Sequence, residues 1–364
     1  MLHQVKRLRF IDALRSFAIL MMLQGHFVST FLGDSFRINN DLFYLIWKYC
    51  RGFTAPVFFT ITGFIFMFLL FKNPQKGINN PRVAKGIKRG FELIIWGYLL
   101  RLNLFGLMKG KLYPAFFQTD VLHIIGVSLL ILIGLYLLLN KLSSQIFQFL
   151  LIGLALTIFI LEPLYKGVVL DVHPIFSSYF SQANGAVFYV FPWLGYCLLG
   201  ASFAVFFNNT YQKLTSLLPY AFASIAIGLW LIFGSATLLE SMFEVFQFQL
   251  LDMVAENNHR FIRLGNTLVL FGVFMLLEKQ FKPSIFLEIG QRTLSVYIIH
   301  YFVLYGTWFG LGLNRLIPHN LSTFQSISGA LLFIAVVCAL VLSYYKYGYS
   351  IEKKFRKYIQ EKIR

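Results

Sequence analysis

Charged residues are scarce in this sequence. Only 13% of its 364 residues are Asp, Glu, Lys or Arg, whereas 58% are hydrophobic and 18% aromatic, and the mean hydropathy is +0.69. A typical soluble domain has about 25% charged residues. The composition therefore excludes an ordinary soluble protein and indicates a polytopic membrane protein.

Cysteine is scarce too. Cys50, Cys197 and Cys338 are scattered and show no C-x-x-C spacing, so the sequence predicts neither a disulfide framework nor a zinc site. We expect no metal and no tightly bound cofactor. We also expect no cleavable signal, because the first apolar segment is longer than the core of a signal peptide and further spans follow it.

Apolar windows of about 20 residues, the length that crosses a hydrocarbon core, predict ten transmembrane helices. They lie at 10–32, 53–71, 90–108, 120–139, 145–162, 185–207, 216–236, 261–279, 293–312 and 325–345. The segment 41–51 is too short to cross and is predicted to be an interfacial or re-entrant helix. We therefore expect an all-α polytopic membrane protein, with one integral membrane domain over 1–346 and a basic tail over 347–364.

Acidic residues are half as common as basic ones: 15 against 32, a net charge of +17. Ten crossings place both termini on one side, together with the basic segments 1–9, 72–89 and 346–364. By the positive-inside rule both termini are predicted to be cytoplasmic. The charge then indicates topology and contact with anionic lipid rather than nucleic acid. We therefore expect an integral membrane protein.

Two connecting segments stand out by charge. Six of the eighteen residues in 72–89 are Lys or Arg, which favours binding to lipid or to a phosphorylated ligand. The segment 237–258 has four acidic residues and no Lys or Arg, and its apolar spacing predicts a helix lying on the outer surface.

The stretch "DALRSFAILMMLQGH" (12–26) introduces three ionisable residues into the first apolar helix. Arg15 and His26 are eleven residues apart, about three helical turns, and Asp12 lies one turn before Arg15, so all three share a face. Along the axis Arg15 and His26 are separated by ~16 Å at ~1.5 Å per residue. Asp12 and Arg15 alone would suggest an interfacial ion pair. A histidine in phase with them indicates a functional column, since ionisable groups inside a bilayer usually line a pathway.

Five stretches in order resemble the transmembrane acyltransferase superfamily. They are Arg15-x10-His26, "APVFFTITGF" (55–64), "TDVLHIIGVSLL" (119–130), "FPWLGYCLLG" (191–200) and "IGQRTLSVYIIHYFVLYG" (289–306). The chain most resembles bacterial members of the heparan-α-glucosaminide N-acetyltransferase catalytic-domain family, which are related to acyltransferase type 3. The resemblance implies a location in the bacterial cytoplasmic membrane. Ser16 departs from the Gly usual in that family, and His123 from the commoner Gln.

The resemblance implies transfer of an acetyl or short acyl group from cytoplasmic acyl-CoA to a hydroxyl or amine of a carbohydrate or glycan at the outer side. The expected partners are thus acyl-CoA, such an acceptor, membrane lipid and, as one assembly, a second copy of the chain. Arginine suits the phosphate end of coenzyme A, because its guanidinium donates two parallel hydrogen bonds to phosphate. Histidine suits the thioester end, as a general base or as a nucleophile that becomes acylated. We favour the general base.

Further polar residues are assigned by position. We predict His26 and Asp12 as catalytic residues. The predicted donor-binding residues are Arg15, Lys88, Arg89 and Arg101. The predicted acceptor-binding residues are Asp120, His123, Trp193, Tyr297 and His300. For Lys88 and Arg89 a role as topological anchors is the simpler interpretation, and Asp120 and His123 suit a structural pair equally well. Trp193 suits a kinked span, and His300, like Asn266, suits an interhelical hydrogen bond.

Two alternatives belong to other functional classes. A secondary transporter of a small anionic or sugar substrate would use Asp12, Arg15 and His26 as a proton relay or substrate site. A non-catalytic partner in glycan assembly would tolerate alanine at His26. Substrate counterflow without an acyl donor would identify the transporter.

Overall fold

The computed structural model describes residues 7–37, 41–214 and 216–348. Within these ranges every regular element is helical, and one isolated bridge pairs Leu32 with Leu321. The chain divides into two compact units, unit 1 (Met1–Ile11 and Gly52–Gln280) and unit 2 (Asp12–Arg51 and Phe281–Arg364). The first helix begins in unit 1 and continues in unit 2. The all-α fold is confirmed.

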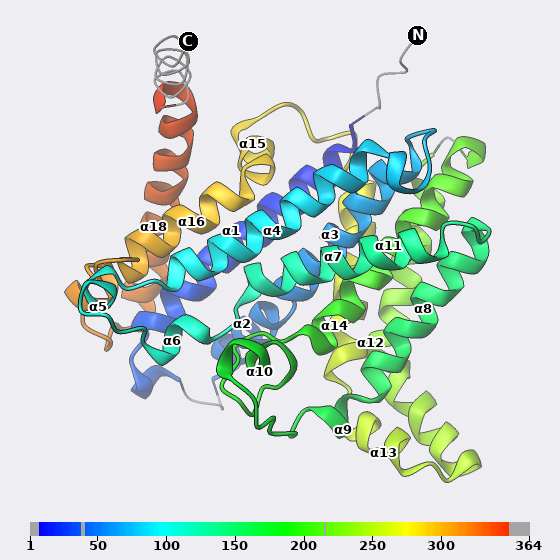
Figure 1. Cartoon of the computed structure of the whole chain (residues 1–364), viewed down its shortest axis with the longest axis horizontal. Coiled ribbons are helices and arrows are strands. Elements are labelled where there is room, and N and C mark those ends of the chain that lie inside the picture. The colour runs from blue at the N-terminus through cyan, green and yellow to red at the C-terminus, as the bar shows by residue number, and fades with distance from the viewer. Residues whose placement is uncertain (1–6, 38–40, 215, 349–364) are drawn as a thin grey trace. The chain divides into compact units, whose positions relative to one another are not determined.

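Unit 1 contains the helices between the second and eighth predicted spans (Figure 1). They are α3 (Thr54–Phe71), α4 (Pro81–Arg101), α5 (Leu104–Met108), α6 (Pro114–Phe117), α7 (Val121–Leu139), α8 (Ser144–Ile160), α9 (Glu162–Tyr165), α10 (Pro174–Phe180), α11 (Val190–Leu214), α12 (Leu218–Phe246), α13 (Gln249–Glu256) and α14 (His259–Leu276), with the 3₁₀ turn η2 (Gly77–Asn79).

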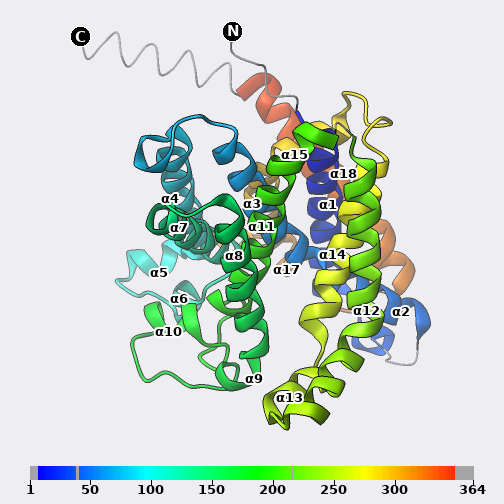
Figure 2. The same cartoon turned by 90° about the vertical axis from the view of Figure 1, so that its right-hand side faces the viewer.

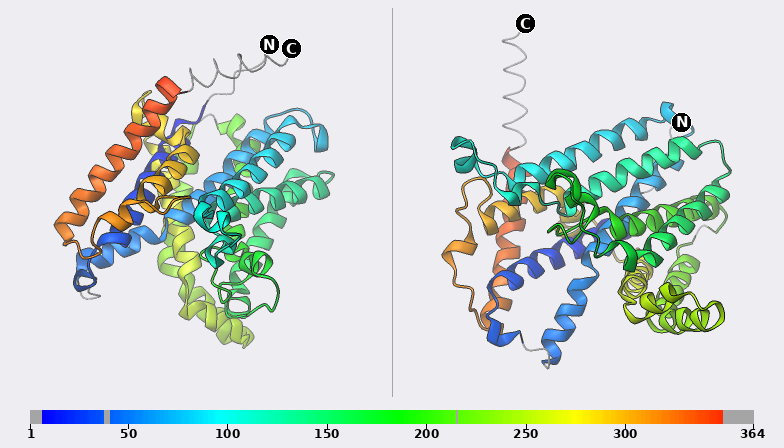
Figure 3. Two further views of the ribbon diagram at one scale, coloured as in Figure 1. Left: turned by 60° about the vertical axis from the view of Figure 1, so that its left-hand side comes forward. Right: turned by 60° about the horizontal axis from the view of Figure 1, so that its bottom comes forward.

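Unit 2 combines the start and the end of the chain. Its elements are α1 (Arg9–Phe31), η1 (Asp34–Phe36), α2 (Leu42–Gly52), α15 (Ile285–Gln291), α16 (Thr293–Tyr305), α17 (Leu313–Leu316), α18 (Thr323–Ser343) and the π-helical turn η3 (Tyr344–Gly348). Figure 3 shows α16 and α18 as neighbours. Phe27 of α1 packs on Phe333 of α18, with ring centroids 5.5 Å apart.

A helix lies at each of the ten predicted spans. Six segments among the described residues are long and apolar enough to cross a membrane: Arg9–Phe31, Leu42–Phe71, Pro114–Leu139, Val190–Tyr211, Leu218–Phe246 and Thr323–Gly348. The helices α8 and α16 are apolar but shorter. The helix α4 carries charged residues along its length, and α14 carries Arg260 and Arg263 near its start.

Several predicted boundaries are wrong, for local reasons. The third helix begins at Pro81 instead of 90, because Asn80 caps it by accepting a hydrogen bond from the Arg82 amide and Pro81 is pre-set for the first turn. Half of the basic segment 72–89 is therefore helical. The ninth helix ends at Tyr305 instead of 312, because Gly306 adopts φ +65°.

The acidic segment 237–258 is not one surface helix. Its first half extends α12 to Phe246, and only Gln249–Glu256 forms the separate helix α13. The helix breaks at Gln247, because this residue adopts a left-handed conformation with φ 53°. The predicted helix at 41–51 is found as α2. The tail predicted over 347–364 lies outside the described residues, except for its first two.

Pairs of helices in unit 1 approach each other most closely at glycines, which have no side chain to keep the backbones apart. Figure 2 shows α12 and α14 side by side. At their crossing, a Cβ on Gly228 would lie 2.6 Å from the Gly265 carbonyl, and a Cβ on Gly265 would lie 2.5 Å from the Gly228 carbonyl. The pair α4 and α7 meets in the same way at Gly90 and Gly126. Small residues let apolar helices approach closely enough for extensive van der Waals contact.

The N-terminus of α1 is capped by a distant carboxylate. Glu278, which follows α14, accepts hydrogen bonds from the Phe10 amide at 2.5 Å and from the Arg9 amide at 3.2 Å. Two of the amides that a helix leaves unpaired are thus satisfied, and the negative charge complements the helix dipole.

Candidate active site

The predicted site residues form two groups, one in each unit. Unit 2 holds Asp12, Arg15, His26, Tyr297 and His300, and unit 1 holds Lys88, Arg89, Arg101, Asp120, His123 and Trp193.

The α1 column faces α16 in unit 2. Arg15 Nη2 donates a hydrogen bond of 2.9 Å to Thr293 Oγ1, and Thr293 is the first residue of α16. His26 Nδ1 lies 2.9 Å from the hydroxyl of Tyr305, the last residue of that helix. Because both pairs follow the same order along the chain, α1 and α16 run parallel. Arg15 and His26 therefore contact opposite ends of α16.

His26 lies beside a second histidine. The ring centroids of His26 and His300 are 5.2 Å apart in an edge-to-face arrangement. His300 is fully buried, whereas His26 is half-buried. Tyr297 packs on His300 with ring centroids 4.9 Å apart. Three residues that the sequence assigned to catalysis and to acceptor binding thus form one cluster.

The Tyr305 hydroxyl can orient the His26 ring. In the tautomer whose Nδ1–H donates to the Tyr305 oxygen, the basic lone pair is on Nε2. A ring held in this way is suited to take a proton from a hydroxyl or amine.

Asp12 lies too far away to orient His26. Helix α1 is continuous from Arg9 to Phe31, so fourteen residues separate the two side chains by ~21 Å at ~1.5 Å per residue. This distance excludes a direct contact between the two side chains, and the catalytic role predicted for Asp12 stays a prediction. The Asp12 carbonyl instead accepts a hydrogen bond of 3.0 Å from Ser16 Oγ, which also bonds the Phe286 carbonyl of α15. Gly290 of α15 packs against the same Asp12 carbonyl, so this end of α1 is fixed to α15.

Sequence reasoning missed three residues near His26, namely Tyr301, Tyr305 and Arg51. Tyr301 lies between Tyr297 and Tyr305, with ring centroids 5.1 Å from each. The spacing of these tyrosines at i, i+4 and i+8 marks one face of α16 and was available as a signal. Arg51, at the end of α2, packs its side chain against Gly25, the residue before His26, and no local pattern indicates this contact.

Unit 1 contains a buried cluster around Asp120, the N-cap residue of α7. Asp120 Oδ1 lies 3.2 Å from His123 Nδ1, and Arg101 Nε lies 3.5 Å from Asp120 Oδ2. The second distance suits an ion pair but is too long for a strong hydrogen bond. Asp120 and His123 together form a capping box for α7. The partner of Arg101 is thus the residue that caps α7.

Two tyrosines enclose His123. The ring of Tyr98 lies 4.4 Å from that of His123, and its hydroxyl lies 3.0 Å from the hydroxyl of Tyr179. His123 is fully buried, and its ring packs against Gly97. This enclosure favours a structural role for the His123 imidazole.

The remaining predicted residues lie apart from these clusters. Lys88 is exposed, and Arg89 makes a surface ion pair of 2.9 Å with Glu92, which contributes little to stability. Trp193 stacks on Phe59 with centroids 5.3 Å apart, and this contact favours packing over sugar binding. Asn266 donates a hydrogen bond to the Ile262 carbonyl one turn earlier.

Metal binding gains no support in the part of the chain that the structure describes. No group of three or more His, Cys, Asp or Glu side chains there could hold an ion.

Comparison with known proteins supplies the family. The family model described as heparan-alpha-glucosaminide N-acetyltransferase, catalytic, matches residues 7–247, which is more than half of the chain. The match includes the α1 column and the Asp120 cluster, and it ends before His300 and Tyr305. A search of curated proteins finds no match. The chain belongs to the heparan-α-glucosaminide N-acetyltransferase catalytic family, a family of acetyltransferases.

Proposed function

We propose that this protein transfers an acetyl or short acyl group from cytoplasmic acyl-CoA to a hydroxyl or amine of a glycan on the other side of the membrane. The observation that supports it best is the arrangement of Arg15 and His26 on α1 along α16. Arg15 lies at one end, and His26 lies beside His300 at the other. Family membership supports the acyl-transfer class.

The spacing of the column fits the donor. Arg15 and His26 lie ~16 Å apart along α1 at ~1.5 Å per residue, and coenzyme A has a phosphorylated end and a long pantetheine arm. We propose that Arg15 binds a donor phosphate through its planar fork. The thioester then reaches the level of His26.

The chemical step is general-base catalysis in this proposal. His26 Nε2 takes the proton from the acceptor hydroxyl or amine. At the same time the acceptor's oxygen or nitrogen attacks the thioester carbonyl. The tetrahedral intermediate collapses with breakage of the C–S bond. The coenzyme A thiolate leaves and takes up the proton from His26. Tyr305 holds the imidazole during this exchange, and His300 packs against it.

The membrane arrangement is also a proposal. Ten spans with both termini cytoplasmic place α1 and α16 as the first and ninth crossings, which must run in the same direction. The parallel packing of these two helices supports this arrangement. The Arg15 end of the column is then cytoplasmic and the His26 end faces the outer half of the membrane.

Radiolabelled acetyl-CoA incubated with purified protein tests the activity, with glucosamine and lipid-linked glycans supplied as acceptors. Transfer of label that requires both protein and acceptor is expected. If label moves to no acceptor while proteoliposomes exchange substrate without a donor, the protein is a transporter and the proposal fails.

A further inference from the structure

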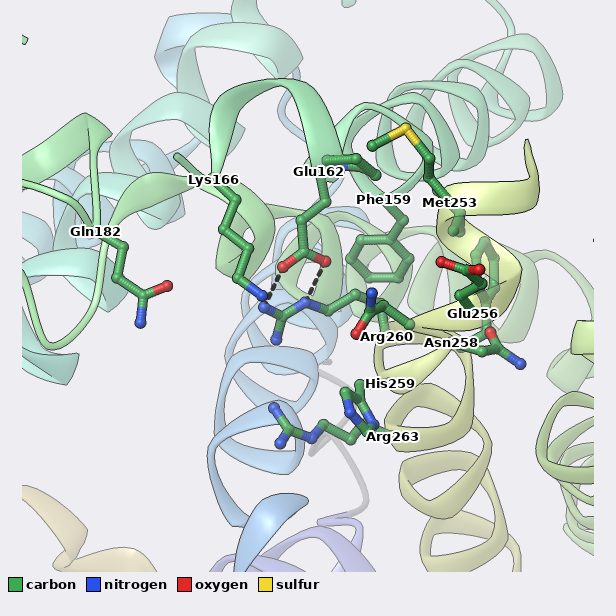
Figure 4. Close-up of a pocket in the computed structure, with 14 residues that line it drawn as sticks. Phe159, Glu162, Lys166, Gln182, Met253, Glu256, Asn258, His259, Arg260 and Arg263 are labelled. Carbon is green, nitrogen blue, oxygen red and sulfur yellow. Dashed lines mark hydrogen bonds and ion pairs between the residues drawn. The ribbon is translucent and has the colours of Figure 1, made fainter. Parts of the chain in front are cut away.

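A cavity of about 280 Å³ lies in unit 1, apart from the clusters described above. It is bounded by residues at the C-terminal end of α8 and from α9, α13 and the first turns of α14 (Figure 4). Its charged and titratable lining residues are Glu162, Lys166, Glu256, His259, Arg260 and Arg263.

One arginine of the cavity is already neutralised. Arg260 Nε donates a hydrogen bond of 2.6 Å to Glu162 Oε2, and Arg260 Nη2 bonds the other carboxylate oxygen. Both side chains are largely buried, at 13% and 12% exposed. Such a two-point pair is rigid and satisfies both charges, so Arg260 and Glu162 form a fixed wall of the cavity.

The second arginine has no counter-ion at contact distance among the residues that the structure describes. Arg263 lies one turn beyond Arg260 and is half-buried. Among the described residues, no carboxylate lies within ion-pair distance of its guanidinium, which packs against the backbone of Gly52. Withdrawing a cation from water without a partner is unfavourable, so an anion in the cavity would stabilise Arg263.

The surroundings of His259 show the same excess of positive charge. Burial, Arg263, Arg260 and Lys166 together lower the pKa of His259, the first helical residue of α14. Within the described chain, no side chain caps the first turn of α14. A helix N-terminus that lacks such a cap adds partial positive charge and amide donors for an anion.

Amide side chains complete the lining. Gln182, Asn257 and Asn258 border the cavity beside the basic residues. Amides both donate and accept hydrogen bonds, so they suit hydroxyl groups attached to an anion. In Figure 4, Lys166 extends from the end of α9 toward the Glu162–Arg260 pair.

We propose that this cavity binds a phosphorylated polyol, with the phosphate between Arg263, Lys166 and the first turn of α14, and with the hydroxyls on the amides. The ligand is either a soluble sugar or glycerol phosphate or the head group of an anionic phospholipid. The proposed site does not take part in acyl transfer, so ligand binding to it is measured without acyl-CoA.

Binding of glycerol 3-phosphate to the full chain in uncharged detergent micelles tests the proposal, with glycerol as the neutral comparison. Isothermal titration at fixed ionic strength should detect the phosphate and not glycerol. Arg263→Gln should weaken binding about tenfold, because a charge-assisted bond is lost. Exposed Lys166→Gln should weaken it about threefold, since a solvated cation contributes less. Lys141→Gln removes an exposed charge elsewhere and should change nothing.

A variant that is expected to raise the affinity for phosphate distinguishes a lost phosphate contact from damage to the fold. Glu162→Gln releases the charge of Arg260, so it should tighten phosphate binding, whereas a disturbed cavity would weaken it. Phosphatidylglycerol added to the micelles identifies the source: competition with glycerol 3-phosphate indicates a lipid head group, and no competition indicates a soluble ligand. The proposal is overturned if wild type binds no phosphate, or if Lys141→Gln lowers affinity as much as Arg263→Gln and Lys166→Gln do.

Discussion

His26 lies where the proposed chemistry needs a base, at 2.9 Å from a tyrosine hydroxyl that can hold its ring. General-base assistance contributes about 10²–10⁴-fold to a rate. We therefore expect His26→Asn to reduce acetyl transfer by about this factor while coenzyme A binding is retained, because asparagine keeps a polar group but takes no proton. Transfer rates and donor binding, measured on the same preparation, check this.

The histidine pair offers a control for that experiment. His300 is buried against His26 but has no assigned proton transfer, so His300→Asn should lower the rate less than His26→Asn does. A His26→Asn protein that transfers at the wild-type rate would make the column structural. Acetyl label retained on that variant would place any acyl-enzyme elsewhere and strengthen the base role of His26.

Arg15 tests the donor end of the column. Arg15→Lys keeps the charge but loses the planar fork that matches phosphate. We expect a weaker affinity for coenzyme A, by about tenfold if one charge-assisted hydrogen bond is lost, and a smaller effect on turnover at saturating donor. Equilibrium binding of coenzyme A to the wild type, Arg15→Lys and Arg15→Ala measures the change in affinity. Unchanged affinity in Arg15→Ala would remove Arg15 from the donor site.

At the scale of helices, unit 1 depends on backbone contacts at glycine. A methyl group on Gly265 meets the Gly228 carbonyl, and overpacking of this kind costs about 1–3 kcal/mol. Gly265→Ala should therefore lower the melting temperature in detergent. Gly153→Ala is the matched control, because no atom lies within 4 Å of its added Cβ in α8. Equal melting temperatures for the two variants would contradict the tight crossing.

The cap of α1 makes a second prediction for an element. Glu278→Ala leaves the Arg9 and Phe10 amides without their carboxylate, and the loss of a helix cap costs about 1 kcal/mol. We expect a lower free energy of unfolding, with the first turn of α1 exchanging its amide hydrogens faster. Hydrogen exchange resolved to peptides measures both effects. Lys279→Ala, at the exposed neighbouring position, should leave exchange in that turn unchanged.

At the scale of the whole molecule, the proposed topology separates basic and acidic segments. After Cys50, Cys197 and Cys338 are replaced, a cysteine introduced at exposed Gln249 should react with an impermeant maleimide in intact cells. Cysteines at exposed Gln75 and at Ser350, which lies outside the described residues, should react only after lysis. Labelling of Ser350→Cys in intact cells would refute the ten-span arrangement.

Local sequence determined the membrane class, the presence of a helix at each of the ten predicted spans, and the face shared by Arg15 and His26. These features depend on apolar length and on a 3.6-residue repeat, which are set within one segment. Boundaries were predicted less well. The cap at Asn80 and the left-handed Gln247 act over a few residues, and apolar windows average over them.

Tertiary structure alone decided the partners. His26 and Tyr305 are separated by 279 positions, and Arg260 and Glu162 by 98. No periodicity relates residues so far apart, because their contact arises only when helices pack side by side. The same reason explains why the sequence did not show that Ser16 and the Asp12 carbonyl pack on α15. The cavity around Arg263 likewise exists only where the ends of several helices meet.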